Sequence, residues 1–268
     1  MKKIISFILT AAIAASLAAC SADKEAENNI IKVGASPSPH REILRRAKDD
    51  LRRRGYQLEI VEFTDYVQPN IALDNGELDA NFFQHQPYLD SFNADNGTKV
   101  VSVGRIHFEP LGLYPGKTAD IADIKDGAVI AVPNDESNEA RALLLLQQLG
   151  LIKIKEDAGL KATPVDIIEN PYNIEIYEIE AAQLPNILPD VDFAVINGNY
   201  AVGAGILDSI LASEDSRGEA AQTYANILAV KEGDENSEKT QALIKALTSE
   251  KIKDFIEEKY QGVFVPVF

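Results

Sequence analysis

Strand and helix patterns alternate in the early part of the chain, and this alternation restricts the fold more than any other feature. Residues 30–35 and 56–63 are rich in strand-forming residues, and a helix that begins near Pro39 separates them. A short helix over 70–76 and a strand over 78–83 follow. A helix between consecutive strands is typical of parallel strands, which need a long crossover connection. The sequence therefore predicts an α/β fold.

The rest of the chain continues this pattern with enough elements for a second lobe. Expected strands cover 100–103, 110–114, 129–132, 176–180, 192–196 and 224–230, and expected helices cover 120–125, 134–150, 181–188 and 237–260. A turn at 115–117 is a candidate crossing between lobes, and the strand at 224–230 would return the chain. We expect lobe 1 to comprise 30–114 plus 227–268, and lobe 2 to comprise 115–226, with a ligand cleft between them.

The N-terminus has the features of a lipoprotein signal. Two lysines precede an uncharged apolar run over 4–17, which is short for a membrane-spanning helix, and small residues then lead to Cys20. We predict a signal peptide over 1–19, lipidation of Cys20, and a polar tether over 20–29. An ordinary signal peptide followed by a chance cysteine is the alternative. Cys20 is the only cysteine, so a disulfide within the chain is excluded.

Charge excludes some classes of partner. Without residues 1–19 the chain has 24 Lys and Arg against 42 Asp and Glu, a net charge of −18. Such a surface repels nucleic acid and anionic lipid headgroups. The helix that begins near Pro39 carries several arginines up to Arg54, but a solvated helix face explains them better than a nucleic-acid site.

A cluster of aromatic side chains indicates a ligand site. Tyr66, Phe83, His85 and Tyr88 occur close together, around a strand end and an expected loop over 84–87. Ligand crevices in open α/β sheets form at the carboxyl ends of strands. We therefore expect a crevice walled by these side chains, although any one ring could belong to the ordinary core.

Several polar residues complement the aromatic cluster. Asn138 and Arg141 share one face near the start of a helix that we expect Asn134 to cap. Arginine matches a carboxylate through two parallel hydrogen bonds, although a surface arginine is the simpler reading of Arg141 alone. Asn197 follows a strand and Asn226 lies in the returning strand, and amide oxygens of this kind accept from an ammonium group. Aromatic walls, one arginine and several asparagines suit a free apolar amino acid, and methionine sulfur packs well on aromatic rings.

The sequence lacks the common catalytic and metal-binding motifs. It contains no GxGxxG, P-loop, GxSxG or HExxH motif, and its three histidines show no ligand spacing. A metal site built from His85 and carboxylates is the remaining alternative. The sequence therefore favours a binding protein without cofactor or metal over an enzyme.

Five stretches of the sequence are long and specific, namely VEFTDYVQPNIALDNGELDANFFQHQPYL, PLGLYPGK, VPNDESNEARALLLLQQLG, EAAQLP and DFAVINGNYA. Together they resemble the NlpA family of lipoproteins, the methionine-binding components of ABC importers. The similarity spans about residues 31–268 and implies a two-lobe periplasmic-binding-protein fold that closes on methionine. It also implies docking on a transporter of permease and ATPase subunits. The protein would be lipid-anchored in the bacterial cell envelope, on the periplasmic or extracellular face.

The resemblance implies roles for eight residues. The methionine side chain would be enclosed by Tyr66, Phe83, His85 and Tyr88. Its carboxylate would be held by Arg141 and Asn138, and its amino group would be bound by Asn197 and Asn226. Glu109 and Asn199 are further candidates. The match departs from the family pattern at Gln86 and at RIHFEPLG. The alternatives are a binding protein for another apolar amino acid or a methionine-containing dipeptide, a surface adhesin-like lipoprotein, and an enzyme on the same fold.

Overall fold

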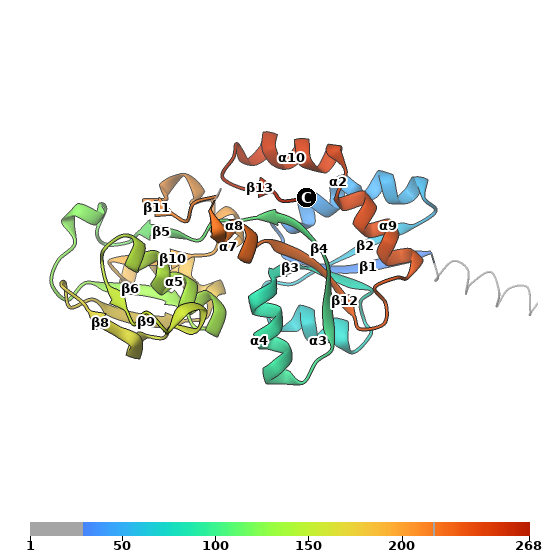
Figure 1. Ribbon diagram of the computed structural model, residues 1–268. Helices are drawn as coiled ribbons and strands as arrows, with labels where there is room; N and C mark the ends of the chain where they lie inside the picture. The colour runs from blue at the N-terminus through green and yellow to red at the C-terminus, as the bar shows by residue number, and fades with distance from the viewer. Residues whose placement is uncertain (1–28, 217) are drawn as a thin grey trace, which may run out of the picture.

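The computed structural model describes residues 29–216 and 218–268. Over this range the chain forms two large mixed β-sheets with helices packed on them, and a short ribbon of β7 and β8 (Figure 1). The predicted signal peptide, Cys20 and the tether before Asn29 lie outside the described residues. Within the described ranges, no helix has both the length and the apolar character needed to cross a membrane.

The first sheet has the strand order β13-β4-β12-β3-β1-β2. Its strands are β1 (Ile30–Ala35), β2 (Gln57–Glu62), β3 (Ala80–His85), β4 (Val100–Phe108), β12 (Asn226–Lys231) and β13 (Val265–Pro266). β1 pairs in parallel with β2 and β3, as the predicted strand–helix–strand order requires. β12 lies antiparallel between β3 and β4. The carboxyl ends of β1 and β3 therefore meet at one edge of the sheet.

Helices cover both faces of this sheet (Figure 1). α2 (His40–Arg53), α9 (Glu238–Leu247) and α10 (Glu250–Tyr260) lie on one face, and α3 (Gln68–Asp74) and α4 (Gln86–Asn96) lie on the other. α2 buries Ile43, Leu44 and Leu51, which recur at helical spacing. These side chains share a core with Leu247 of α9 and Ile256 of α10. The helices α2, α9 and α10 thus bury one apolar face of the first sheet.

The second sheet has the strand order β11-β5-β10-β6-β9. Its strands are β5 (Gly112–Pro115), β6 (Val129–Pro133), β9 (Glu175–Ile179), β10 (Phe193–Ile196) and β11 (Ala212–Ser213). The accompanying elements are α5 (Glu136–Gln148), α6 (Leu184–Ile187), α7 (Gly198–Gly203), α8 (Glu219–Thr223), β7 (Lys153–Ile154) and β8 (Ile167–Glu169). Leu143 and Leu146 of α5 pack in one core with Phe193 and Val195 of β10. α5 is therefore fixed to the sheet by its apolar side chains, and its first turn extends to the sheet edge.

The chain crosses between the sheets over residues 109–111 and returns over 214–225. The prediction of a crossing at 115–117 is wrong, because β5 pairs with β10 inside the second sheet. Most of the segment 110–114, which we expected in the first lobe, thus lies in β5 of the second sheet. The predicted return over 224–230 is confirmed, because β12 pairs with β3 and β4.

Two helix starts differ from the expectation. β3 continues to His85 and α4 begins at Gln86, so the loop predicted over 84–87 is wrong. Pro87 sits in the first turn of α4, where its missing N–H group costs no hydrogen bond. α5 is capped by Asp135 and not by Asn134, because the Asp135 backbone is extended and its carboxylate accepts from an amide of the first turn.

The second sheet contains a position where only glycine fits. A Cβ atom on Gly116 would lie 2.3 Å from the Val191 carbonyl oxygen and 2.5 Å from that of Leu188. The main chain there is held by the hydrogen bond from the Gly116 N–H group to the Asp192 carbonyl, 2.9 Å long. The backbone therefore has no room to move away from an added methyl group.

We expect Gly116→Ala to lower the free energy of unfolding by about 1–3 kcal/mol, the usual cost of overpacking. Urea unfolding measures this change. Gly104→Ala is the matched control, since a Cβ atom on Gly104 meets nothing within 4 Å. Equal stability of the two variants would contradict the close approach at Gly116.

Candidate ligand-binding site

A small cavity lies between the carboxyl ends of β3 and β10. All eight residues predicted from the sequence line it, namely Tyr66, Phe83, His85, Tyr88, Asn138, Arg141, Asn197 and Asn226. Gln84, Glu109, Gly198 and Asn199 complete the lining. The structure thus brings together side chains from both sheets, and their role toward a ligand is taken up under the proposed function.

His85 joins the two lobes in a defined tautomer. Its Nδ1 atom accepts from the Tyr88 backbone N–H group at 3.2 Å, which caps α4. The other ring nitrogen, Nε2, lies 3.2 Å from Asn138 Oδ1 and therefore carries the proton that it donates. Burial, and then the neighbouring Arg141 cation, lower the pKa of His85 to about 3. His85 is a neutral imidazole at physiological pH.

Three aromatic rings form an apolar wall beside His85. The ring centroids of Tyr66 lie 5.9 Å from Phe83 and 5.8 Å from Tyr88, and those of Phe83 and Tyr88 are 6.1 Å apart. Tyr66 donates its hydroxyl proton to Asn199 Oδ1 at 2.6 Å, and Tyr88 donates to the Tyr66 carbonyl at 2.9 Å. Because the two hydroxyl groups are satisfied at the edge, the ring faces remain apolar.

Asn138 organises the polar side of the cavity. Its amide nitrogen donates to both carboxylate oxygens of Asp135, at 2.9 and 3.1 Å. Its oxygen accepts from the Asn197 amide at 2.8 Å in addition to His85. The side chain of Asn138 is therefore fully used in holding its neighbours. Asn197 Oδ1, in contrast, is buried and has no hydrogen-bond partner among the described residues.

The hydrogen-bond partners of Arg141 differ from those that the sequence predicted. Its Nε atom donates to Glu214 Oε1 at 2.7 Å, and Nη2 donates to Glu214 Oε2 at 2.5 Å and to the Glu109 carbonyl at 2.8 Å. The predicted pair of parallel bonds to a ligand carboxylate is therefore wrong in this geometry, since Glu214 occupies that fork. No hydrogen bond of the described residues uses Nη1, which remains available to a ligand. The guanidinium also stacks on Tyr224, 4.4 Å from the ring centroid.

Glu214 was not among the residues predicted from the sequence. This residue is 73 positions from Arg141 in the chain, and no local pattern marks it. Its carboxylate also accepts from the Leu111 N–H group at 2.7 Å. Burial of a charged pair of this kind is tolerated when the other polar atoms are also bonded, and here both carboxylate oxygens of Glu214 and the Nε and Nη2 atoms of Arg141 are bonded.

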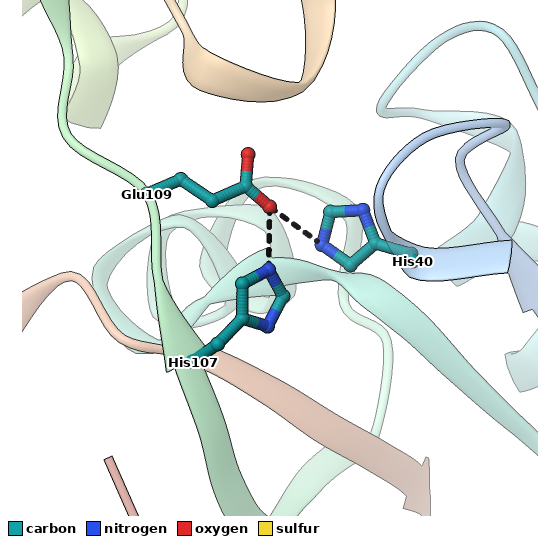
Figure 2. A group of neighbouring side chains, drawn as sticks. All are labelled: His40, His107 and Glu109. Carbon is teal, nitrogen blue, oxygen red and sulfur yellow. Dashed lines mark hydrogen bonds and ion pairs between the residues drawn. The ribbon is translucent and has the colours of Figure 1, made fainter. Parts of the chain in front are cut away.

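Glu109 lies at the edge of the cavity and extends toward two buried histidines, which were also missed (Figure 2). Its Oε1 atom is 2.7 Å from His107 Nε2 and 3.3 Å from His40 Nε2. His40 Nε2 is also 2.9 Å from Asn226 Oδ1, so both of its near neighbours are acceptors and Nε2 carries a proton. Burial lowers the pKa of His40 to about 4 and that of His107 to about 3. Burial raises the pKa of Glu109 to about 7, against the stabilising charges of His40 and Arg141.

These three residues have the donor types of a metal site, with ligand atoms within 4.8 Å of one another. Two ligands of one tetrahedral zinc ion lie roughly 3.3 Å apart, which is wider than the 2.7 Å between Glu109 and His107. Ring nitrogens opposite a metal normally donate to a partner, whereas Nδ1 of both His40 and His107 has none among the described residues. The geometry suits a hydrogen-bonded cluster better than a metal centre.

The family of the chain follows from comparison with known proteins. The family model for NlpA lipoproteins matches residues 31–268, which covers nearly all of the described structure. The chain belongs to the NlpA lipoprotein family. The resemblance seen in the sequence is confirmed by this match.

Members of the NlpA lipoprotein family with known names resemble the chain over almost its whole length. D-methionine-binding lipoprotein MetQ of Escherichia coli (strain K12) is 37% identical, over 97% of this chain and 97% of the relative. Membrane lipoprotein TpN32 of Treponema pallidum (strain Nichols) is 40% identical, over 94% of this chain and 92% of the relative. A solved nutrient binding protein from Burkholderia cenocepacia bound to methionine is 45% identical, with a TM-score of 0.84 over 89% of this chain and 100% of that one. The predicted two-lobe binding-protein fold is thereby confirmed.

The raised pKa of Glu109 predicts a pH dependence of stability. The folded protein keeps this carboxyl protonated up to about pH 7, whereas an ordinary glutamate releases its proton near 4.5. The contribution of Glu109 to stability therefore falls as the pH rises through this window, by up to about 1.4 kcal/mol per pH unit. Glu109→Gln removes the titrating group at nearly constant size.

Urea unfolding between pH 5 and pH 7 should show that Glu109→Gln gains stability relative to the natural protein as the pH rises. The solvent-exposed Glu258 offers a control, since Glu258→Gln should leave the pH profile unchanged. Parallel pH profiles for Glu109→Gln and the natural protein would show that burial does not raise this pKa.

Proposed function

We propose that the protein captures methionine between its lobes and delivers it to an ABC importer. The observation that supports this most is the joint lining of one cavity by an apolar ring wall, an unpartnered buried acceptor and an unused cationic donor. Two of the relatives, MetQ of Escherichia coli and the nutrient binding protein from Burkholderia cenocepacia, are described as methionine-binding or bound to methionine, which agrees with this chemistry. The site residues are the eight predicted from the sequence.

The parts of a methionine molecule find distinct partners in the cavity. The thioether side chain packs on the ring faces of Tyr66, Phe83 and Tyr88, where sulfur interacts favourably. Asn197 Oδ1 accepts from the ammonium group, because a buried acceptor without a partner is otherwise costly. Arg141 Nη1 donates to the carboxylate. Asn138 acts mainly by positioning Asn197 and His85, a narrower role than the sequence implied.

Contacts between the lobes fit a protein that closes on its ligand. Tyr66 of the first lobe bonds Asn199 of the second, and Ser91 Oγ donates to Glu136 at 2.7 Å. A ligand that touches both lobes favours the closed arrangement through its differential contacts. We propose the lobe ranges expected from the sequence, with the first crossing moved to residues 109–111.

The remaining parts of the proposal concern partners and location. The importer would comprise a permease and an ATPase, and the protein would be lipid-anchored in the cell envelope on the periplasmic or extracellular face. We propose no catalytic activity and no cofactor or metal. The rival ligands are another apolar amino acid and a methionine-containing dipeptide. A competition assay with norleucine and methionyl dipeptides distinguishes them, and an adhesin-like lipoprotein would bind none of these.

The proposed role of Arg141 predicts the outcome of a conservative substitution. Lysine keeps the charge beside Glu214 but offers a single ammonium, which cannot replace the fork and also reach a ligand. We expect Arg141→Lys to weaken methionine binding at least about tenfold, or roughly 1.4 kcal/mol. Calorimetric titration of protein that has been unfolded, freed of ligand and refolded measures this affinity.

Arg105→Lys is the matched control, because Arg105 is exposed and bonds Gln222 outside the cavity. It should bind methionine like the natural protein. Natural affinity in Arg141→Lys would remove this residue from the site, and no heat from any methionine titration of the refolded natural protein would reject methionine as the ligand.

The proposed anchor predicts acylation of a single residue. Cells grown with radiolabelled palmitate should incorporate the label into the protein, because small residues precede Cys20 after an apolar run. Cys20→Ala should abolish both the label and the association with membranes. A Cys20→Ala protein that remains labelled would contradict lipidation at this position.

A further inference from the structure

A basic surface lies on α2, in a protein of net charge −16. Six exposed cationic side chains form this basic patch, namely Arg45, Arg46, Lys48, Arg52, Arg53 and Arg54. They occupy the face of the helix that is opposite its buried stripe, and they extend to its carboxyl end. The patch stands out because the rest of the chain is strongly acidic.

Acidic neighbours neutralise the basic patch only in part. Arg52 pairs with Asp49 at 3.2 Å, and Arg53 pairs with Asp50. Asp50 is shared with Lys251 of α10, 3.5 Å away, which adds a further cation beside the patch. No ion pair of the described residues involves Arg45, Lys48 or Arg54. The patch therefore carries a surplus of positive charge that faces solvent.

The chain enters the fold beside this patch. The Asn29 carbonyl accepts from the Gln57 N–H group at 2.8 Å, at the start of β1 and β2. Asn29 shares a surface groove with Lys48 and Arg52 of the patch. In Figure 1 the amino end of β1 and the carboxyl end of α2 lie at the same pole of the first lobe. The predicted lipidation site is thus joined to the fold next to the basic patch.

The distance from the lipidation site is short. Eight residues lie between Cys20 and Asn29, and the nine steps along the chain span at most about 32 Å when fully extended. Acyl chains on Cys20 would lie in the bilayer and would hold Asn29, which lies beside the basic patch, within that distance of the headgroups. A connection of this length gives the patch a high effective concentration at the membrane surface.

We propose that the basic patch of α2 binds anionic phospholipid headgroups when the protein is anchored. This inference rests on the lipidation of Cys20 proposed above. The guanidinium groups match phosphate geometry, and several cations beside one acyl anchor provide the second signal that stable membrane attachment needs. Acidic side chains that lie farther from the headgroups than the Debye length of about 8 Å are largely screened, whereas patch cations that touch the headgroups are screened less.

The contact would also orient the protein. The patch lies at the amino end of β1, whereas the ligand cavity lies at the carboxyl end of the neighbouring β3. Because β1 and β3 are parallel, these two ends are separated along the strand direction, on opposite sides of the first lobe. Binding through the patch therefore points the cavity away from the bilayer, toward the compartment that supplies the ligand.

Fluorescence quenching on vesicles tests the proposal with the lipidated full-length protein. A probe on Gln57→Cys, an exposed position beside the patch, can be attached selectively because acylated Cys20 is blocked. Lipid-borne quenchers should reach this probe in phosphatidylcholine vesicles that contain phosphatidylglycerol, and not in pure phosphatidylcholine. About 1 M salt, with a Debye length of about 3 Å, should abolish the difference. Equal quenching in both vesicles would overturn the proposal.

A charge-reversal variant locates the contact. Arg45→Glu, Lys48→Glu and Arg54→Glu together should abolish the quenching, while Lys125→Glu, Lys153→Glu and Lys161→Glu change the net charge equally and should leave it intact.

The same two triple variants, made in the chain from residue 20 onward with Cys20→Ser, keep every described element but cannot be acylated. The patch variant should then bind anionic vesicles at least about tenfold more weakly than the control. Equal binding would overturn the proposal.

The unacylated chain also separates failure of the patch from failure of lipidation. Anionic-vesicle binding by this chain, with no palmitate incorporation in cells, would refute the lipid anchor and retain the patch. The probe on Gln57→Cys could instead be shielded from quenchers only when the transporter is co-reconstituted, independently of lipid charge. In that case the patch binds protein and the membrane proposal is wrong.

Discussion

The buried pair of Arg141 and Glu214 holds together the two segments by which the chain passes between the lobes. Arg141 projects from α5 of the second lobe and donates to the carbonyl of Glu109 in the first crossing. Glu214 begins the returning segment, and its carboxylate also accepts from the Leu111 N–H group. One guanidinium and one carboxylate thus join the helix to both crossings. Removal of either partner leaves a buried charge uncompensated, which typically costs several kcal/mol, on the order of 3–5.

This arrangement is one of several in which contacts within the protein hold the polar groups of the cavity in place. Arg141 is held by Glu214, Asn138 by Asp135, and His85 by the first turn of α4. Each of these side chains reaches the cavity with its geometry set by a hydrogen bond to a neighbouring residue. In a site of low dielectric, groups that need no reorganisation bind a charged ligand more strongly than mobile ones.

The sequence predicted the gathering of the site residues because each lies at the end or start of an element. Phe83 and His85 end β3, and Asn138 and Arg141 lie near the start of α5, so the α/β architecture brings them to one edge. Glu214 could not be predicted in the same way, since it is distant in sequence and follows the short edge strand β11. The crossing was misplaced because a short strand such as β5 has no sequence mark for the sheet it joins.

The strand order of the first sheet has a consequence for the time at which this lobe can form. β12 lies between β3 and β4, yet it follows the whole second lobe in the chain. As the chain folds from its amino end, the first lobe therefore lacks its central strand until the second lobe has been completed, and contacts of such long sequence separation form slowly. The second lobe is, in effect, an insertion between two neighbouring strands. Exchange of lobes between relatives is simplest when this inserted segment is replaced as one continuous piece, which leaves the first lobe intact.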